Sequence, residues 1–446
     1  MKRIIAFAGV LCLLSCTDDA FTIEGNNTVP DDFQNVEWSV NFGGTGDDSA
    51  RSIIQTADGG YAILGMTNST DGDLAFKNLA VNDYWLVKLD ATGTLEWQRT
   101  YGGSKDDQGQ QIIQTADGGF AITGYAMSDD GDGSNNEGFH DNWILRLDAF
   151  GTILWEKSFG FSGHDHSYDL VQTQDNGFFF SGFLDVTSSN GEGSTDKGSL
   201  TAHGVGEFWG TKIDADGNLQ WRKFFGGTNN DRSFGVVNAQ DGGYVLAGAS
   251  ESDDFDISDP KGSYDFWAVK VSKNGTMEWE QSYGGTGIDQ AQDILATPDG
   301  GYVITGNTFS SDTQVTKNNG QSDVWLIKID GTGQLLWQKS FGGSGFDAAH
   351  SVRPTSDGGL LVCGNSKSFD GDVSENFGEN DIWIFKTDAQ GELQWEKSFG
   401  GLSLDFGYDA IETADGSFVL VGEMSSQDFP NLQSKGGIDM VVISMN

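Results

Sequence analysis

Hydrophobic and polar positions alternate in short runs along most of the chain, and the pattern returns about every 58 residues. One period contains four such runs, at 52–56, 61–65, 84–90 and 94–102, rich in β-branched and aromatic residues. The first two are joined by the dipeptide Asp58-Gly59, a strong hairpin signal because glycine supplies the positive φ of such turns. We therefore expect four antiparallel strands per repeat, and no helical periodicity appears after the N-terminus.

Tryptophan marks the repeat, because two series account for all 13 tryptophans of the chain. One series advances by 58 or 59 residues, except for one step of 66, and the other lies twelve residues earlier. The first is Trp38, Trp97, Trp155, Trp221, Trp279, Trp337 and Trp395, and the second is Trp85, Trp143, Trp209, Trp267, Trp325 and Trp383. We expect each pair to lie on one face of its third-to-fourth hairpin and to pack between repeats.

Seven repeats of four antiparallel strands predict an all-β, seven-bladed β-propeller. The chain enters the repeat at a lone fourth strand, 37–44, and leaves it after a third strand, 439–445. We expect the N-terminal strand to complete the C-terminal blade, because an open array would leave a face bare. The predicted propeller spans 37–446.

The N-terminus carries the pattern of an exported protein. Two cations precede a short apolar run that ends at Leu13-Leu14-Ser15-Cys16, which resembles the lipobox of bacterial lipoproteins. This resemblance implies a signal peptide at 1–15, a lipid on Cys16 and a polar tether over 16–36. The following Thr17-Asp18-Asp19 resembles the export signal of Bacteroidetes surface lipoproteins. We expect a monomeric, surface-exposed lipoprotein of the outer membrane, attached to the membrane through this lipid only.

The formal net charge of −41 excludes classes of partner. Without 1–15, 23 basic residues face 66 acidic ones, a net charge of −43. Nucleic-acid binders present basic surfaces, so DNA and RNA are excluded as partners. Divalent cations are plausible ligands of such a chain. Cys363 is the one cysteine left besides Cys16, so no intramolecular disulfide is expected.

Two acidic series recur with the repeat. An acid after each Phe/Tyr-Gly-Gly element, in which Phe161 replaces the second glycine in the third repeat, forms the first: Asp48, Asp107, Asp165, Asp231, Asp289, Asp347 and Asp405. An acid before each third strand forms the second: Asp83, Asp141, Glu207, Asp265, Asp323, Asp381 and Asp439. Sevenfold recurrence favours carboxylates that accept N–H bonds in their own turns. The alternative is a cation site near the channel.

Acid-glycine runs in the loops between second and third strands suggest calcium. Asp-x-Asp spacing with glycine can wrap a hard cation, although the full EF-hand pattern is absent. The candidate ligands are Asp71, Asp73, Asp129, Asp132, Asp370 and Asp372. The alternative is that these acids are merely solvated.

The third repeat gathers histidine where the period lengthens to 66. Four of the five histidines fall on its loops or on the neighbouring loop, and imidazoles with nearby carboxylates can bind a transition metal such as zinc. The candidate ligands are His140, His164, Asp165, His166, His203 and Glu207. The alternative is a chance grouping of surface histidines in a loop insertion.

Two repeat families resemble this chain. The runs LDATGTLEW, IDADGNLQW and TDAQGELQW resemble the pyrroloquinoline-quinone-type propeller repeat, which implies that tryptophan docks one blade on the next. The FGGxxxD…TxDGGY combination is similar to bacterial β-propeller repeats of the SBBP type, found in secreted and surface proteins. Seven blades rather than eight, and no adjacent cysteine pair, argue against a quinone dehydrogenase.

Three functions are compatible with these features. The first is a surface-tethered, non-enzymatic binding or scaffold propeller that recognises a glycan or a protein through its loops. The second is a hydrolase of extracellular polysaccharide, because paired carboxylates suit glycoside cleavage. The third is a purely structural surface protein. No single acid stands out from its six equivalents, so we assign no catalytic residue.

Overall fold

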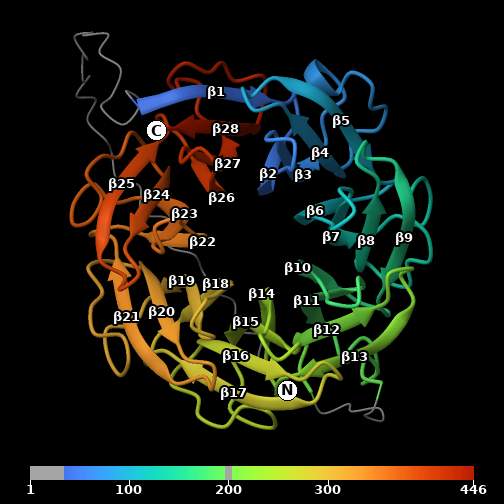
Figure 1. The fold of residues 1–446 in the computed structure, drawn as a ribbon, viewed down its shortest axis with the longest axis vertical. Helices are drawn as coiled ribbons and strands as arrows, with labels where there is room; N and C mark the ends of the chain where they lie inside the picture. Colours follow the sequence, from blue (N-terminus) through green and yellow to red (C-terminus); the bar gives the residue numbers. More distant parts are fainter. Residues whose placement is uncertain (1–34, 196–202) are drawn as a thin grey trace, which may run out of the picture.

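The protein is a closed ring of seven four-stranded antiparallel sheets (Figure 1). The computed structural model describes residues 35–195 and 203–446. The predicted signal peptide, the lipid site Cys16 and the tether up to residue 34 lie outside the described residues. The predicted all-β, seven-bladed propeller is confirmed.

Every complete blade repeats the same four strands, running from the central channel to the rim. Blade 1 is β2 (Asp48–Gln55), β3 (Tyr61–Thr67), β4 (Asp83–Leu89) and β5 (Leu95–Tyr101). Blades 2 and 3 are β6 (Asp107–Gln114), β7 (Phe120–Ala126), β8 (Asp141–Leu147), β9 (Ile153–Phe159), then β10 (His166–Gln172), β11 (Phe178–Leu184), β12 (Glu207–Ile213) and β13 (Leu219–Phe225). Blades 4 and 5 are β14 (Asp231–Asn238), β15 (Tyr244–Ser250), β16 (Asp265–Val271), β17 (Met277–Tyr283), then β18 (Asp289–Ala296), β19 (Tyr302–Thr308), β20 (Asp323–Ile329) and β21 (Leu335–Phe341). Blade 6 is β22 (Asp347–Pro354), β23 (Leu360–Ser366), β24 (Asp381–Thr387) and β25 (Leu393–Phe399).

Blade 7 joins the two ends of the chain. It contains β26 (Asp405–Glu412), β27 (Phe418–Met424) and β28 (Asp439–Met445), and β1 (Val36–Phe42) pairs antiparallel with β28 as the outer strand. The predicted closure is confirmed, and Figure 1 shows β1 beside β28 at the rim. Outside the strands, the described residues include a 3₁₀ turn at Gly72–Leu74.

The first strand of a blade is longer than the sequence pattern predicted. In blade 1 it begins at Asp48 rather than Ser52, because residues on both sides of a register shift between Ala50 and Ser52 pair with β3. A β-bulge of this kind interrupts the alternation from which strand bounds are read. The strand therefore reaches the acid that opens it.

The two tryptophans of a blade lie on opposite faces, so the prediction of a shared face was wrong. Trp85 pairs with Thr100, whereas Trp97 pairs with Lys88, three residues along β4. Because side chains alternate across a strand, this odd separation puts the two indoles on opposite sides. Trp85 packs in a cluster with blade 7, and the Trp97 ring lies 6.3 Å from that of Phe120 in blade 2. Blades 1 to 6, which carry both tryptophans, thus contact both of their neighbours through tryptophan, whereas blade 7 carries Trp38 only.

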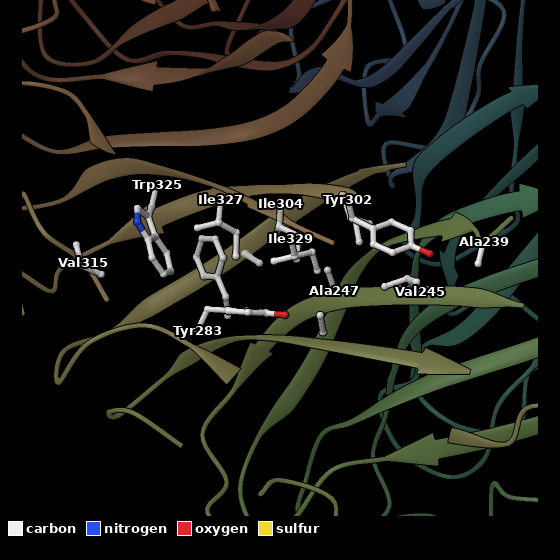
Figure 2. Packing of buried hydrophobic residues seen from close by; sticks show 14 residues of the cluster. Ala239, Val245, Ala247, Tyr283, Tyr302, Ile304, Val315, Trp325, Ile327 and Ile329 are labelled. Carbon is white, nitrogen blue, oxygen red and sulfur yellow. The ribbon is translucent and has the colours of Figure 1, made fainter. Parts of the chain in front are cut away.

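The hydrophobic core lies between blades. Figure 2 shows Val245 and Tyr283 of blade 4 packing with Ile304, Trp325 and Ile327 of blade 5 in one buried cluster. Three of the outer indoles also hydrogen-bond to the next blade: Trp155 Nε1 donates to the carbonyl of Ala215 at 3.1 Å, and Trp221 and Trp279 make the equivalent bonds. The ring is therefore held together by seven similar interfaces.

Trp325→Ala is expected to lower the free energy of unfolding by about 3–5 kcal/mol. The Trp325 side chain is fully buried, packs edge-on against Phe266 and donates Nε1 to Gln338 at 2.9 Å. The matched variant is Trp279→Ala, which removes a half-buried indole and should cost clearly less. Urea unfolding followed by fluorescence checks both variants, and equal losses would contradict this account of the interfaces.

Within 35–195 and 203–446, no helix has the length and apolar composition that a membrane span requires.

Candidate functional site

The longer loops gather on one face, which we call the top face. It consists of the loops from second to third strands and those from fourth strands to the next first strands. Short parallel bridges join the two kinds of loop, for example Ser322 with Phe346. The hairpin turns lie on the opposite, bottom face.

The acids that open the first strands are buried caps of their own turns. Asp289 accepts N–H from Gly285 at 2.7 Å and the Ser310 hydroxyl at 2.9 Å, and it also bonds Thr308. The other six members of the first acidic series are likewise fully buried. This is the arrangement expected if the recurrence is structural, and it keeps these carboxylates away from any ligand in solvent.

The second acidic series is bonded on one oxygen only. Asp141 Oδ2 accepts the N–H of Glu137 at 2.7 Å, and Asp323 Oδ2 that of Asn319 at 2.7 Å. The other carboxylate oxygen is buried without a hydrogen-bond partner in six blades: Asp83, Asp141, Asp265, Asp323, Asp381 and Asp439. Glu207 differs, since its Oε1 accepts N–H from Gly204 at 3.0 Å and its Oε2 lies 3.2 Å from His203 Nδ1.

Burial makes acids of both series weak. It raises the pKa of Asp165 to about 8 and that of Asp141 to about 7, and each charge further opposes ionisation of a neighbouring acid. The same cause raises the pKa of Asp381 to about 7 and that of Asp265 to about 6. Because the shift recurs in blade after blade, a raised pKa singles out no catalytic acid.

The acid-glycine loops turn several of their carboxylates inward. Asp71 Oδ1 accepts the N–H of Thr45 at 2.7 Å, and Asp73 Oδ2 accepts that of Gly43 at 3.0 Å. Asp370 and Asp372 bond the N–H groups of Ser344 and Gly342 in the same way, and Asp132 bonds that of Gly102, whereas Asp129 is exposed. These bonds are an alternative role for the acids, and calcium binding there stays a prediction.

The structure brings together three of the six residues predicted to bind a transition metal. His140, His164 and His166 come together, each offering one ring nitrogen within 4.8 Å of one nitrogen of the others. We call these three residues the histidine cluster. It lies at the top-face junction of blades 2 and 3.

The remaining predicted ligands lie apart from the cluster. The carboxylate of Asp165 turns into its own loop, where it accepts N–H from Phe161 at 2.7 Å and from Asp185 at 2.9 Å. His203 pairs with Glu207 instead, and its ring stacks on Phe255 at 4.6 Å.

The cluster has neighbours that sequence reasoning missed. His140 Nε2 lies 3.5 Å from Asp106 Oδ2, and the ring of Tyr125 stacks on that of His166 at 3.8 Å. Asp106 occupies, one blade earlier, the repeat position of His164, so alignment of the repeats could have found it. Burial, together with the other two histidines, lowers the pKa of His166 to about 2, which leaves this imidazole neutral.

The central channel holds a cavity of about 360 Å³ lined by the innermost strands. Arg353 reaches Asp409 Oδ1 at 3.0 Å and also pairs with Asp293. Although burial opposes its charge, these carboxylates hold the pKa of Arg353 above its usual range. Asp293 accepts the N–H of Val352 at 2.9 Å, which links blades 5 and 6. The charged groups of the channel therefore connect blades.

Large apolar side chains are exposed mainly on the top face. Of the fifteen exposed large hydrophobics among the described residues, ten lie on top-face loops. These ten, which we call the apolar ring, are Phe76, Leu79, Phe139, Val205, Phe255, Ile288, Phe309, Phe369, Leu402 and Leu404. Their exposure was not predicted, because loop apolars carry no periodic signal.

A curated protein is similar in sequence to part of the chain. No family model matches. Regulatory protein FlaEY of Caulobacter vibrioides is 30% identical over 154 residues, which make up 32% of this chain and 15% of that protein. The chain thus spans about a seventh of the length of that curated relative.

Several solved structures are similar in arrangement. YCF48 bound to D1 peptide matches with 10% identity and a TM-score of 0.47, over 92% of this chain and 96% of that one. BamB from Moraxella catarrhalis matches with 12% identity and a TM-score of 0.41, over 91% and 100%. Sqt1 from Chaetomium thermophilum matches with 12% identity and a TM-score of 0.46, over 92% and 100%. The propeller assignment itself rests on the strand pairing of this chain.

Proposed function

We propose that the protein is a non-enzymatic binding module that holds a protein partner against its top face. The observation that carries this proposal is the apolar ring, which concentrates exposed Phe, Leu, Ile and Val on one face of a strongly acidic molecule. Exposed apolar groups gain free energy when a partner covers them, by about 25 cal/mol for each Å². Apolar side chains surrounded by polar residues are typical of protein interaction surfaces.

Part of the ring forms a local patch at the junction of blades 5 and 6. The rings of Phe309 and Phe346 lie 5.9 Å apart, and Phe369 is on the next loop, whose Lys367 N–H bonds the Phe346 carbonyl at 2.9 Å. Phe369 is 76% exposed, more than any other large hydrophobic side chain described. Three phenylalanines on adjoining loops suit an apolar side chain of a partner.

The position of β1 supports an outward-facing binding surface. β1 is an outer strand and runs from the bottom face to the top face, so the chain enters the propeller at the bottom. Trp38 lies beside the bottom turn at Gly93, and Asn446 donates a hydrogen bond to Glu37 at 2.8 Å, so the start of β1 and the end of β28 both lie at the bottom face. We propose that the lipid predicted on Cys16 tethers the protein to the outer membrane by this end, which would point the apolar ring away from the lipid.

The glycan and hydrolase alternatives receive less support. All 13 tryptophans lie in the buried or half-buried repeat positions, so none of these rings is offered on the top face for sugar stacking. The paired acids of the top face are buried and serve as turn acceptors, so a polysaccharide would not reach them. Both alternatives would give results of their own in a capture assay.

Replacing Phe309 and Phe369 by Asp is expected to weaken capture of the partner at least tenfold, because the charges would oppose burial of the patch. The measurement is a pull-down from an envelope extract with the immobilised full chain, quantified against wild type. The matched control is Phe150→Asp, which alters a bottom-face phenylalanine whose exposure (70%) is close to that of Phe369 (76%), and it should leave capture unchanged.

Each alternative has its own signature in this assay. Capture of polysaccharide instead of protein by the wild type would favour the glycan alternative, and release of shortened sugars would favour the hydrolase. Equal capture by the top-face and bottom-face variants would contradict the proposed face.

A further inference from the structure

Backbone pairing holds the three residues of the histidine cluster close together. His140 precedes β8 and His164 lies in the loop that leads into β10, and a parallel bridge joins these two residues. Asp165 N–H bonds the His140 carbonyl at 2.7 Å, and Phe139 N–H bonds the Gly163 carbonyl at 2.9 Å. His166 follows within the start of β10. Three imidazoles from two blades are therefore held by strand and bridge geometry, which favours a preorganised site.

The distances within the cluster suit shared coordination. His140 Nδ1 and His164 Nδ1 lie 3.0 Å apart, and the ring of His166 lies 5.1 Å from that of His140. Two nitrogens at 2.0–2.1 Å from one tetrahedral Zn²⁺ lie roughly 3.3 Å apart. A small shift of two side chains would therefore bring both Nδ1 atoms to ligand positions.

Of the two ring nitrogens of His166, Nε2 is the one available to bind a metal ion. Its Nδ1 lies 3.2 Å from the Tyr168 hydroxyl, whereas its Nε2 is buried and has no hydrogen-bond partner. A buried polar atom without a partner is costly unless a ligand satisfies it.

Asp106 supplies the outer contact that metal-bound histidines commonly have. Its Oδ2 faces His140 Nε2 at 3.5 Å, on the side of the ring away from His164. Histidine ligands usually give their second nitrogen to a carboxylate or carbonyl, which fixes the tautomer and the ring orientation. Asp106 is itself anchored by Gln108 Nε2 at 2.8 Å.

The repeat provides six internal comparisons. The residues at the positions of His140, His164 and His166 at the other junctions are Asn82, Asp106 and Gln108; Gly206, Asn230 and Arg232; Tyr264, Ile288 and Gln290; Ser322, Phe346 and Ala348; Asn380, Leu404 and Phe406; and Ile438, Asp47 and Ser49. None is histidine. The repeat therefore does not require imidazole at these positions, and the three histidines that depart from it lie together at one blade junction.

We propose that His140, His164 and His166 bind one Zn²⁺ ion, which joins blades 2 and 3 at the top face. Imidazole nitrogens prefer zinc and its first-row neighbours to calcium or magnesium, which take oxygen ligands. Three protein ligands leave a fourth position for water or for a group of a partner. His164 is exposed and borders a surface depression with Phe139 and Ser188, so the proposed site can be reached from solvent on this side.

The test uses the full chain, freed of metal with a chelator and then dialysed. Titration with Zn²⁺ in a calorimeter should give one ion per chain, and Co²⁺ should give the intense visible bands of a tetrahedral site. His164→Gln should weaken Zn²⁺ binding by more than 100-fold, and because His164 is exposed this variant should fold. Asp106→Asn should weaken binding by about 10–100-fold, as for other outer partners of a metal site.

The matched control is His203→Gln, which alters a top-face histidine outside the cluster and should bind Zn²⁺ as wild type does. Thermal unfolding gives an independent readout, since Zn²⁺ should raise the melting temperature of wild type but not of His164→Gln. Heat no greater than dilution into buffer, weak octahedral Co²⁺ bands, or equal affinity of wild type and His164→Gln would each overturn the proposal.

Discussion

Raising the pH from 5 to 8 is expected to lower the free energy of unfolding by several kcal/mol. The cause is the set of buried aspartates whose pKa lies above the ordinary value of 3.8. Burial raises the pKa to about 6 for Asp83, Asp231, Asp265 and Asp323, to about 7 for Asp141, Asp169 and Asp381, and to about 8 for Asp165.

The sign follows from the protons that each state holds. Between pH 3.8 and its folded pKa, such an acid stays protonated in the folded chain and is ionised in the unfolded chain. The folded state therefore holds more protons, and its stability falls as the pH rises through this window. The bottom-turn acids Asp299 and Asp357 act in the opposite sense, because hydrogen bonds from Lys328 and Lys386 lower their pKa. Their contribution is complete above about pH 5 and is constant from there to pH 8.

Two half-buried histidines oppose the trend over part of the range. Burial lowers the pKa of His166 to about 2 and that of His350 to about 4, so both are neutral in the folded chain. The unfolded chain protonates them below pH 6.5, which reduces stability there. Above pH 6.5 this effect ends, and the acids alone set the slope.

Urea unfolding of the full chain at constant ionic strength, with chelator present, measures this dependence at pH 5, 6.5 and 8. The matched variant is Asp381→Asn, which keeps an acceptor for the Phe377 N–H and places a donor at the unpartnered oxygen near Asp405. It should reduce the slope by up to about 1.4 kcal/mol per pH unit near neutrality. Stability that is constant or rises between pH 6.5 and 8 would contradict the buried acids.

Removing the residues up to Phe42 is expected to cost more than about 5 kcal/mol, which approaches the whole stability of many domains. The deletion removes β1, exposes the edge of β28 and takes away the packing of Trp38 and Val40 on the core between blades 7 and 1. Each buried apolar side chain contributes about 1.5–3 kcal/mol, and the lost strand hydrogen bonds add to this. The truncated chain should unfold at much lower urea concentration.

A peptide of residues 35–46 should restore stability by adding the missing strand to blade 7, as in other cases of strand addition. The control peptide carries Val40→Pro, because proline cannot donate a strand hydrogen bond and should not complement. A truncated chain as stable as the full chain would show that β1 does not close the ring.

The fold could be predicted from the sequence because each weak signal of strand or turn recurs from repeat to repeat. Asp-Gly turns, strand-length apolar runs and the tryptophan spacing agree in most blades, although blade 3 has Asn176 between Asp175 and Gly177 and a longer period, and the lone strands at the two ends of the repeat imply closure. The faces of the tryptophans could not be predicted in the same way. Trp85 and Trp97 are separated by a turn and a register shift, so their relative faces depend on the pairing of Lys88 with Trp97.

The candidate site was predictable only in part. His140, His164 and His166 converge because two repeat positions that are distant in sequence meet at each blade junction. Asp165 lies between two of them but faces the opposite way, since alternation along the chain turns its carboxylate into the loop. The sequence could not show this, nor that His203 would pair with Glu207. The apolar ring depends on exposure in loops, which sequence pattern does not encode.

The most direct measurement of the central claim is photo-crosslinking of the full chain in cells. A photoreactive phenylalanine analogue would replace Phe369 on the top face or Phe150 on the bottom face, two side chains of similar exposure. The account predicts one discrete protein adduct from position 369 and none from position 150. Adducts from position 150 alone, or no adduct from either position, would contradict a binding module that works through its top face.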